Sequence, residues 1–160
     1  MRLRIAAVGR LKDGPERQLY SRYGERIAAA GRGVALGPLD LVEMAEARDA
    51  GAPARMADEA ARLLGKCRDA DVRVVLDERG KTMSSEAFAQ TLRGFRDRPA
   101  GRLAFLIGGP DGHGSVVRDE ADLLLSLSPM TLPHGLARVV LVEQIYRAVT
   151  IIAGHPYHRA

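Results

Sequence analysis

Short apolar runs recur along the chain, and longer segments with helical spacing separate them. The runs are rich in Leu, Val, Ile and Ala and end at Gly, Pro or charged residues, which is typical of buried β-strands. We predict strands over residues 3–8, 36–44, 72–76, 103–107 and 123–127. Because buried strands alternate with helices, the pattern predicts a parallel sheet in an α/β fold.

The segments between these runs predict helices that bury one face. Asp13 is a candidate N-cap for the first helix, and Leu19 is expected on its inner face. In the second helix, Glu59 is expected on the outer face, where it pairs with Arg55 at i, i+4 spacing. These two helices therefore carry ordinary amphipathic patterns.

The last predicted helix, over residues 136–153, is apolar on nearly every face, and its polar stripe is narrow. A helix that is apolar all round is buried all round. We expect that its own domain does not wrap it, so the pattern predicts a subunit interface and a homodimer. Gly154 and Pro156 then stop the helix, which leaves an extended tail with basic and aromatic residues.

The composition is that of a globular protein, with 46% hydrophobic and 28% charged residues, and 160 residues is about the size of one domain. We therefore expect residues 1–160 to form a single domain. The formal net charge is +4, and 21 of the 24 basic residues are Arg. Arg favours bidentate contact with phosphate, although solvated surface faces account for the same balance equally well.

The sequence argues against several classes of function. Cys67 is the only cysteine, and the four His show no i, i+4 pair, so we expect no metal. Gly80-Lys81-Thr82 resembles the end of a phosphate-binding loop, but Val75 stands where that loop needs Gly. No apolar run reaches about 18 residues, and the start lacks a signal-peptide layout. We expect a cytoplasmic protein without a membrane segment.

Ligands of parallel sheets bind outside the carboxyl ends of the strands, which here carry residues 77–80, 108–112 and 128–130. Gly108 and Gly109 permit close approach of a ligand to the backbone, although such a pair is also typical of a plain tight turn. If a ligand lies there, a branched side chain at Gly109 is expected to fill its space. The loop 126–133 is apolar enough to pack as a connector or to line a flat heterocycle.

Four segments together resemble one known family. They are FLIGGPDG (105–112), LSPMTLPH (127–134), RVVLVEQIYRA (138–148) and HPYHR (155–159). This combination is similar to the ribosomal RNA large subunit methyltransferase H family, the pseudouridine methyltransferases of the SPOUT superfamily. Residues 3–9 and 76–81 share the likeness, and residues 30–60 are the least distinctive.

The resemblance implies a parallel-sheet SPOUT fold whose C-terminal segment forms a trefoil knot, which general folding rules alone would reject. It implies a homodimer that methylates a ring nitrogen of pseudouridine in large-subunit (23S) ribosomal RNA of assembled ribosomes. The cofactor is S-adenosyl-L-methionine. By resemblance, the residues that bind it are Leu76, Gly108, Gly109, Leu127, Ser128, Pro129, Met130, Thr131 and Leu132.

The tail is the expected contact with RNA, because Tyr stacks on unpaired bases and Arg holds phosphates, although chain ends are often inert. The expected RNA-binding residues are Arg147, His155, Tyr157, His158 and Arg159. No catalytic residue is assigned; His134, Glu143 and His158 are candidates for a general base. Two alternatives stay open: a ribose 2′-O-methyltransferase on a related knot, and a ribosome-binding assembly factor without catalysis.

Overall fold

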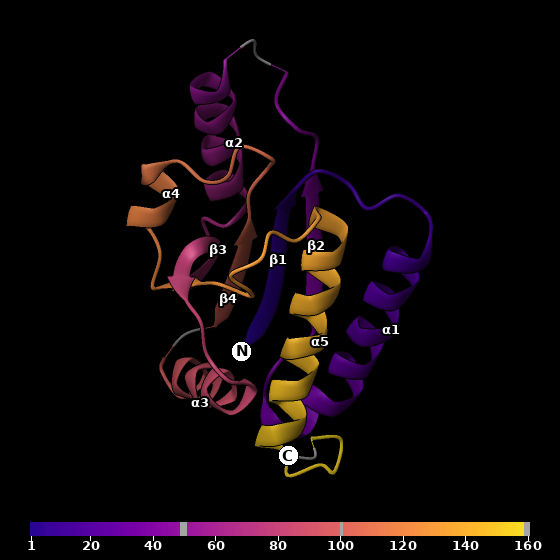
Figure 1. The fold of residues 1–160 in the computed structure, drawn as a ribbon. Helices are drawn as coiled ribbons and strands as arrows, with labels where there is room; N and C mark the ends of the chain where they lie inside the picture. The colour runs from indigo at the N-terminus through magenta and orange to yellow at the C-terminus, as the bar shows by residue number, and fades with distance from the viewer. Residues whose placement is uncertain (49–50, 100, 159–160) are drawn as a thin grey trace.

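The fold was obtained as a computed structural model that describes residues 1–48, 51–99 and 101–158. Its strands all run parallel in one sheet with the order β2-β1-β4-β3-β5 (Figure 1). Their bounds are β1 (Arg2–Val8), β2 (Leu39–Met44), β3 (Val72–Lys81), β4 (Arg102–Ile107) and β5 (Leu123–Leu125). The predicted α/β fold with a parallel sheet is therefore confirmed.

Helices cover both faces of this sheet. They are α1 (Pro15–Ala30), α2 (Ala52–Lys66), α3 (Ser85–Arg96), α4 (Ser115–Asp119) and α5 (His134–Ile152), with a 3-10 turn at Gly31–Val34. One face packs against α1, α3 and α5, and the other packs against α2 and α4 (Figure 1). Successive strand residues alternate between the two cores, as the pleat requires: Ile5 faces the first and Ala6 the second.

Strand β3 is longer than the sequence pattern predicts. It continues past Leu76 through an irregularity to Lys81, and both residues pair with Leu125 of β5. A Cβ at Gly80 would lie 2.6 Å from the carbonyl carbon of Leu125, closer than real Cβ contacts come. The glycine therefore permits the close crossing of β3 and β5. The charged residues at 77–79 hid this extension from the apolar pattern.

Most of helix α5 is covered by its own chain, which contradicts the expectation that its own domain does not wrap it, while Val139, Val140, Ile151 and Ile152 stay partly exposed. It packs between α1 and α3 against the sheet, and Leu141, Ile145 and Val149 have no exposed surface. Leu136, at the start of the helix, keeps 46% of its surface exposed. The homodimer itself stays a prediction.

Three helix expectations also differ from the structure. The N-cap of α1 is Gly14 rather than Asp13, and no side chain caps it. Leu19 is 40% exposed, and the neighbouring Tyr20 is buried instead, in the same core cluster as Ile27. Glu59, expected at the surface, is buried at 4% exposure because the segment after β2 and the glycine turn after β4 cover it.

Candidate functional site

A cavity of about 470 Å³ opens at the carboxyl edge of the sheet, between residues 76–79 of β3, the loops after β4 and β5, and the first turn of α5. Its volume lies within the range of small-molecule sites. All nine residues expected to bind the cofactor line it: Leu76, Gly108, Gly109, Leu127, Ser128, Pro129, Met130, Thr131 and Leu132. The structure thus brings together three segments that are far apart in the sequence, at the edge where parallel sheets bind ligands.

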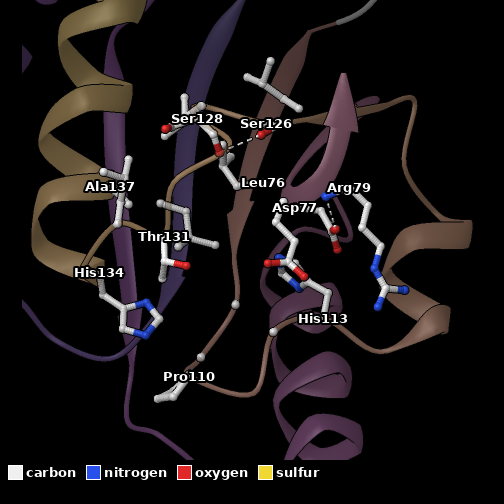
Figure 2. A pocket seen from close by; sticks show the side chains of 18 of the residues that line it. Leu76, Asp77, Arg79, Pro110, His113, Ser126, Ser128, Thr131, His134 and Ala137 are labelled. Atoms are coloured by element: carbon white, nitrogen blue, oxygen red, sulfur yellow. Dashed lines mark hydrogen bonds between the residues drawn. The ribbon is translucent and has the colours of Figure 1, made fainter. Parts of the chain in front are cut away.

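The two sides of the cavity differ in character. In Figure 2, Thr131 and His134 lie on one side, and Asp77, Arg79 and His113 lie on the opposite side. The first side belongs to the loop before α5 and to its first turn. The second side is built by the end of β3 and the segment before α4, and it carries most of the charge.

The loop after β5 holds its shape through its own small polar groups. The hydroxyl of Ser126 donates to the Ser128 carbonyl at 3.1 Å, and the Met130 N–H donates to the Ser128 hydroxyl at 2.9 Å. Leu127 and Leu132 are half-buried, while Met130 is 77% exposed. The loop therefore offers an apolar lining with backbone groups, which suits a flat heterocycle.

The glycine turn after β4 is tight and also lines the cavity. The Gly112 N–H donates to the Gly109 carbonyl at 2.9 Å, and Gly112 has a φ of 77°. A Cβ at Gly108 would lie 3.1 Å from the His113 ring, and one at Gly109 would lie 2.5 Å from the Glu59 carboxylate. A side chain at Gly109 would therefore first meet Glu59, and its expected effect on ligand binding stays a prediction.

Asp77 organises the charged side of the cavity. Its carboxylate accepts hydrogen bonds from Arg118 Nε at 2.7 Å and from the Arg79 N–H at 2.9 Å. Burial raises the pKa of Asp77, but the hydrogen bonds and the Arg118 charge outweigh burial and bring the pKa below its usual range. Asp77 therefore stays ionised and joins the end of β3 to α4.

His113 is a cavity residue that sequence reasoning did not select. It is 3% exposed, and its Nε2 has no hydrogen-bond partner among the described residues. Burial lowers the pKa of His113, although the nearby Asp77 charge opposes this shift. The imidazole is therefore neutral at pH 7. Its position after a strand end was the available signal.

Arg138 anchors the first turns of α5 and was also missed as an individual residue. It is 1% exposed, and its guanidinium donates to Glu43 Oε1 at 2.8 Å and to the Val8 and Gly9 carbonyls at 2.7 and 3.0 Å. Burial lowers the pKa of Arg138, and Glu43 opposes this. This group ties β1, β2 and α5 together beneath the cavity. An Arg among the apolar residues of the first turns of α5 was the signal.

The tail is folded back on the helices rather than extended, so that expectation is wrong. Tyr157 packs its ring edge on Tyr146 at 4.7 Å and donates its hydroxyl to Glu143 at 3.2 Å. His158 Nε2 lies 2.7 Å from the Glu86 carboxylate of α3. Aromatic packing and these polar contacts hold residues 155–158 beside the far half of α5, where they do not line the cavity.

The expected RNA-binding residues are only partly brought together. Arg147 donates two hydrogen bonds to Glu143 and lies over the Tyr157 ring at 5.0 Å. His155 is exposed, and Arg159 lies outside the described residues. Glu143 also accepts a hydrogen bond from Gln144, so its carboxylate holds this cluster together. Of the three candidate bases His134, Glu143 and His158, only His134 lines the cavity of its own chain.

Metal sites and membrane-spanning helices are both absent from the described residues. No group of three or more His, Cys, Asp or Glu side chains is arranged to hold a metal ion in these parts of the chain. Among the helices of residues 1–48, 51–99 and 101–158, none is both long and apolar enough to cross a membrane.

Comparisons with known proteins identify the family. A family model described as "Predicted SPOUT methyltransferase" matches residues 1–158. A solved structure of a probable methylase family protein from Haemophilus influenzae Rd KW20 shares the fold, with a TM-score of 0.55 and 11% identity, over 99% of this chain and 70% of that chain. The chain is a SPOUT methyltransferase.

Two curated relatives narrow this class. The ribosomal RNA large subunit methyltransferase H of Methylobacterium radiotolerans is 51% identical over 99% of this chain and 98% of the relative. The protein of that name from Xanthobacter autotrophicus is also 51% identical, over the full length of both chains. The chain belongs to the ribosomal RNA large subunit methyltransferase H family.

Proposed function

We propose that this protein transfers the methyl group of S-adenosyl-L-methionine to a ring nitrogen of a pseudouridine in large-subunit ribosomal RNA. The observation that carries the proposal is the cavity at the carboxyl edge of the sheet, lined by three loops that match the family in sequence. The choice of large-subunit ribosomal RNA as the substrate rests on the names of the relatives. The proposed setting is the assembled ribosome in the bacterial cytoplasm.

The residues of the cavity fit the cofactor. The loop from Leu127 to Leu132 offers backbone groups and apolar contacts for an adenine ring, and Leu76, Gly108 and Gly109 complete the enclosure. The buried His113 Nε2 has no hydrogen-bond partner among the described residues and is suited to a polar group of a ligand. When bound, S-adenosyl-L-methionine supplies an electrophilic methyl group on a positively charged sulfur. The chain's contribution is to orient that group and keep water away from it.

Methyl transfer to a ring nitrogen also requires that the nitrogen loses its proton. The imide-like N–H of the base is weakly acidic, so a modest base in the cavity suffices. His134 is the candidate because it lines the cavity, across from Asp77 (Figure 2). The Glu143 carboxylate, in contrast, is occupied by Arg147, Gln144 and Tyr157.

The tail is proposed to contact RNA, and its position bears on how it does so. Ala137 of the cavity and Ile152 are 15 residues apart on α5, which is about 22 Å along the helix. An RNA hairpin that spans this distance reaches both places. In a homodimer, the tail of one copy can instead serve the cavity of the other. Exposed Leu19 and Leu136, on the adjoining helices α1 and α5, are suited to such an interface.

Two further expectations from the family accompany this proposal. We propose that residues 1–160 form one domain, which is supported by the single sheet that all five strands share. We also propose that the chain from β4 to α5 is threaded as a trefoil knot. The close crossing of β3 and β5 at Gly80 is compatible with such threading.

The proposal is tested by comparing ribosomal RNA from a bacterial strain with and without this gene. Loss of one methyl group from a large-subunit pseudouridine, restored by the gene, is the expected result. A missing ribose methyl group would favour the 2′-O-methyltransferase alternative. Unchanged RNA modification together with defective ribosome assembly would favour the assembly factor. Sedimentation of the purified protein at micromolar concentration tests the homodimer.

A further inference from the structure

A buried carboxylate lies directly behind the glycine turn of the cavity. Glu59 of α2 is 4% exposed, and its Oε1 accepts a hydrogen bond from the Ala47 N–H at 2.9 Å. Its Oε2 is buried and has no hydrogen-bond partner among the described residues. A buried acid of this kind is costly unless something compensates its charge.

The basic side chains nearest along α2 pair with other acids. Arg55 pairs with Asp111 at 2.7 Å, and Arg62 pairs with Asp58 at 2.7 Å. On the cavity wall, Asp77 pairs with Arg118. Within the part of the chain that the structure describes, no Lys or Arg forms an ion pair with Glu59. Among the described residues, the Glu59 carboxylate therefore has no ion-pair partner, and its Oε2 faces Gly109.

This carboxylate lies against Gly109, which lines the cavity. A Cβ at Gly109 would lie 2.5 Å from Glu59 Oε2, and a carbon–carbon bond is about 1.5 Å, so Oε2 lies within about 4 Å of the Gly109 Cα. A ligand atom in van der Waals contact with the other side of Gly109 adds about 4 Å. Such an atom therefore lies about 8 Å from the carboxylate.

We infer that Glu59 makes the cavity selective for the positively charged methyl donor over its neutral product. This inference rests on the proposed function. Transfer breaks the bond between sulfur and the methyl carbon, and the sulfur keeps the electron pair and loses its positive charge. S-Adenosylhomocysteine, the product, is otherwise the same molecule. A negative charge behind Gly109 therefore attracts the donor and favours release of the product.

The expected size of the effect follows from Coulomb's law. At about 8 Å and an effective dielectric constant of about 20, attraction between unit charges corresponds to a factor of roughly 30 in affinity. Water at the open side of the cavity reduces this, so we expect roughly a tenfold preference. Glu59 is in this sense a specificity-determining residue that acts through space, without touching the ligand.

The test is calorimetric titration of S-adenosyl-L-methionine and of S-adenosylhomocysteine into the wild-type protein and into Glu59→Gln. The amide keeps the shape of the side chain and an oxygen for the Ala47 N–H. We expect the donor to bind about tenfold more weakly and the product to change less than twofold. The difference should persist at 0.5 M salt, because a buried charge is poorly screened. Glu25→Gln, the same change on the exposed face of α1, is the matched control and should leave both affinities unchanged.

Several results would overturn the inference. If Glu59→Gln binds both ligands more weakly by the same factor, Glu59 serves only packing. If both affinities are unchanged, Glu59 has no part in ligand recognition. Thermal unfolding identifies which variants are folded. If Glu59→Gln does not fold, Glu59→Asp is measured in its place. This variant keeps the negative charge, so it should still bind the donor more tightly than the product. Loss of that preference would contradict the inference. A wild-type protein that binds neither ligand would refute the proposed function itself.

Discussion

Replacing Arg138 with Met tests the group that anchors α5 beneath the cavity. The change removes the bond to Glu43 and the two bonds to the carbonyls that end β1, while Met fills a similar volume. Breaking a buried ion pair by removing one partner costs about 3–5 kcal/mol. Glu43 is 14% exposed and still accepts a hydrogen bond from the Leu11 N–H at 2.7 Å. We therefore expect Arg138→Met to lower the free energy of unfolding by about 3 kcal/mol, the lower end of this range.

The measurement is urea unfolding followed by circular dichroism, with the free energy extrapolated to water. The matched control is Arg93→Met, because Arg93 is 67% exposed and lies 3.9 Å from Asp97. Exposed pairs of this kind contribute little, so the control should change stability by less than about 0.5 kcal/mol. A loss below about 1 kcal/mol for Arg138→Met would refute the reasoning, since the buried pair would then add nothing beyond a surface pair.

Three other changes test separate parts of the account. Gly80→Ala should cost about 1–3 kcal/mol in thermal unfolding, because its Cβ meets the β5 backbone, whereas Gly65→Ala, in open space on α2, should not destabilise. Burial lowers the pKa of His113, so the unfolded chain binds more protons below about pH 6.5, and stability falls as the pH falls from 7. His113→Leu should flatten this fall in urea unfolding, and a slope like that of wild type would contradict it. Deleting residues 155–160 should lower methyl transfer at least about a hundredfold with cofactor affinity nearly unchanged, and full activity would limit the tail to packing.

The strands and the cavity loops were predictable because their signals are local. Residues 103–107 form an apolar run that ends at paired glycines, and the chain has to place such a strand inside a sheet with its end at the carboxyl edge. The family motifs then selected the residues that line the cavity. Three strand bounds were wrong: β2 begins at Leu39 rather than at residue 36, β5 ends at Leu125 rather than at residue 127, and β3 runs on to Lys81. The extension of β3 was missed because its pairing with Leu125 depends on a neighbour that the local pattern does not contain.

The errors share a tertiary origin. Glu59 has the spacing of a surface residue, and its burial is set by Ala47 and Gly109, which the fold brings over α2 from two other loops. Helix α5 was expected to need a partner subunit because the sequence does not reveal that α1 and α3 flank it. The tail folds back because Tyr146 and Glu143 present a place for Tyr157, which the chain reaches only after the turn at Gly154.

The central claim is methyl transfer from S-adenosyl-L-methionine to a base of large-subunit ribosomal RNA. Its most direct test supplies purified protein and methyl-tritiated cofactor to ribosomes from the gene-deleted strain, and then locates the label by mass spectrometry of RNA fragments. We predict one labelled methyl group per large subunit, on a ring nitrogen of a pseudouridine. Label on a ribose oxygen, or no label from a protein that binds the cofactor, would contradict it.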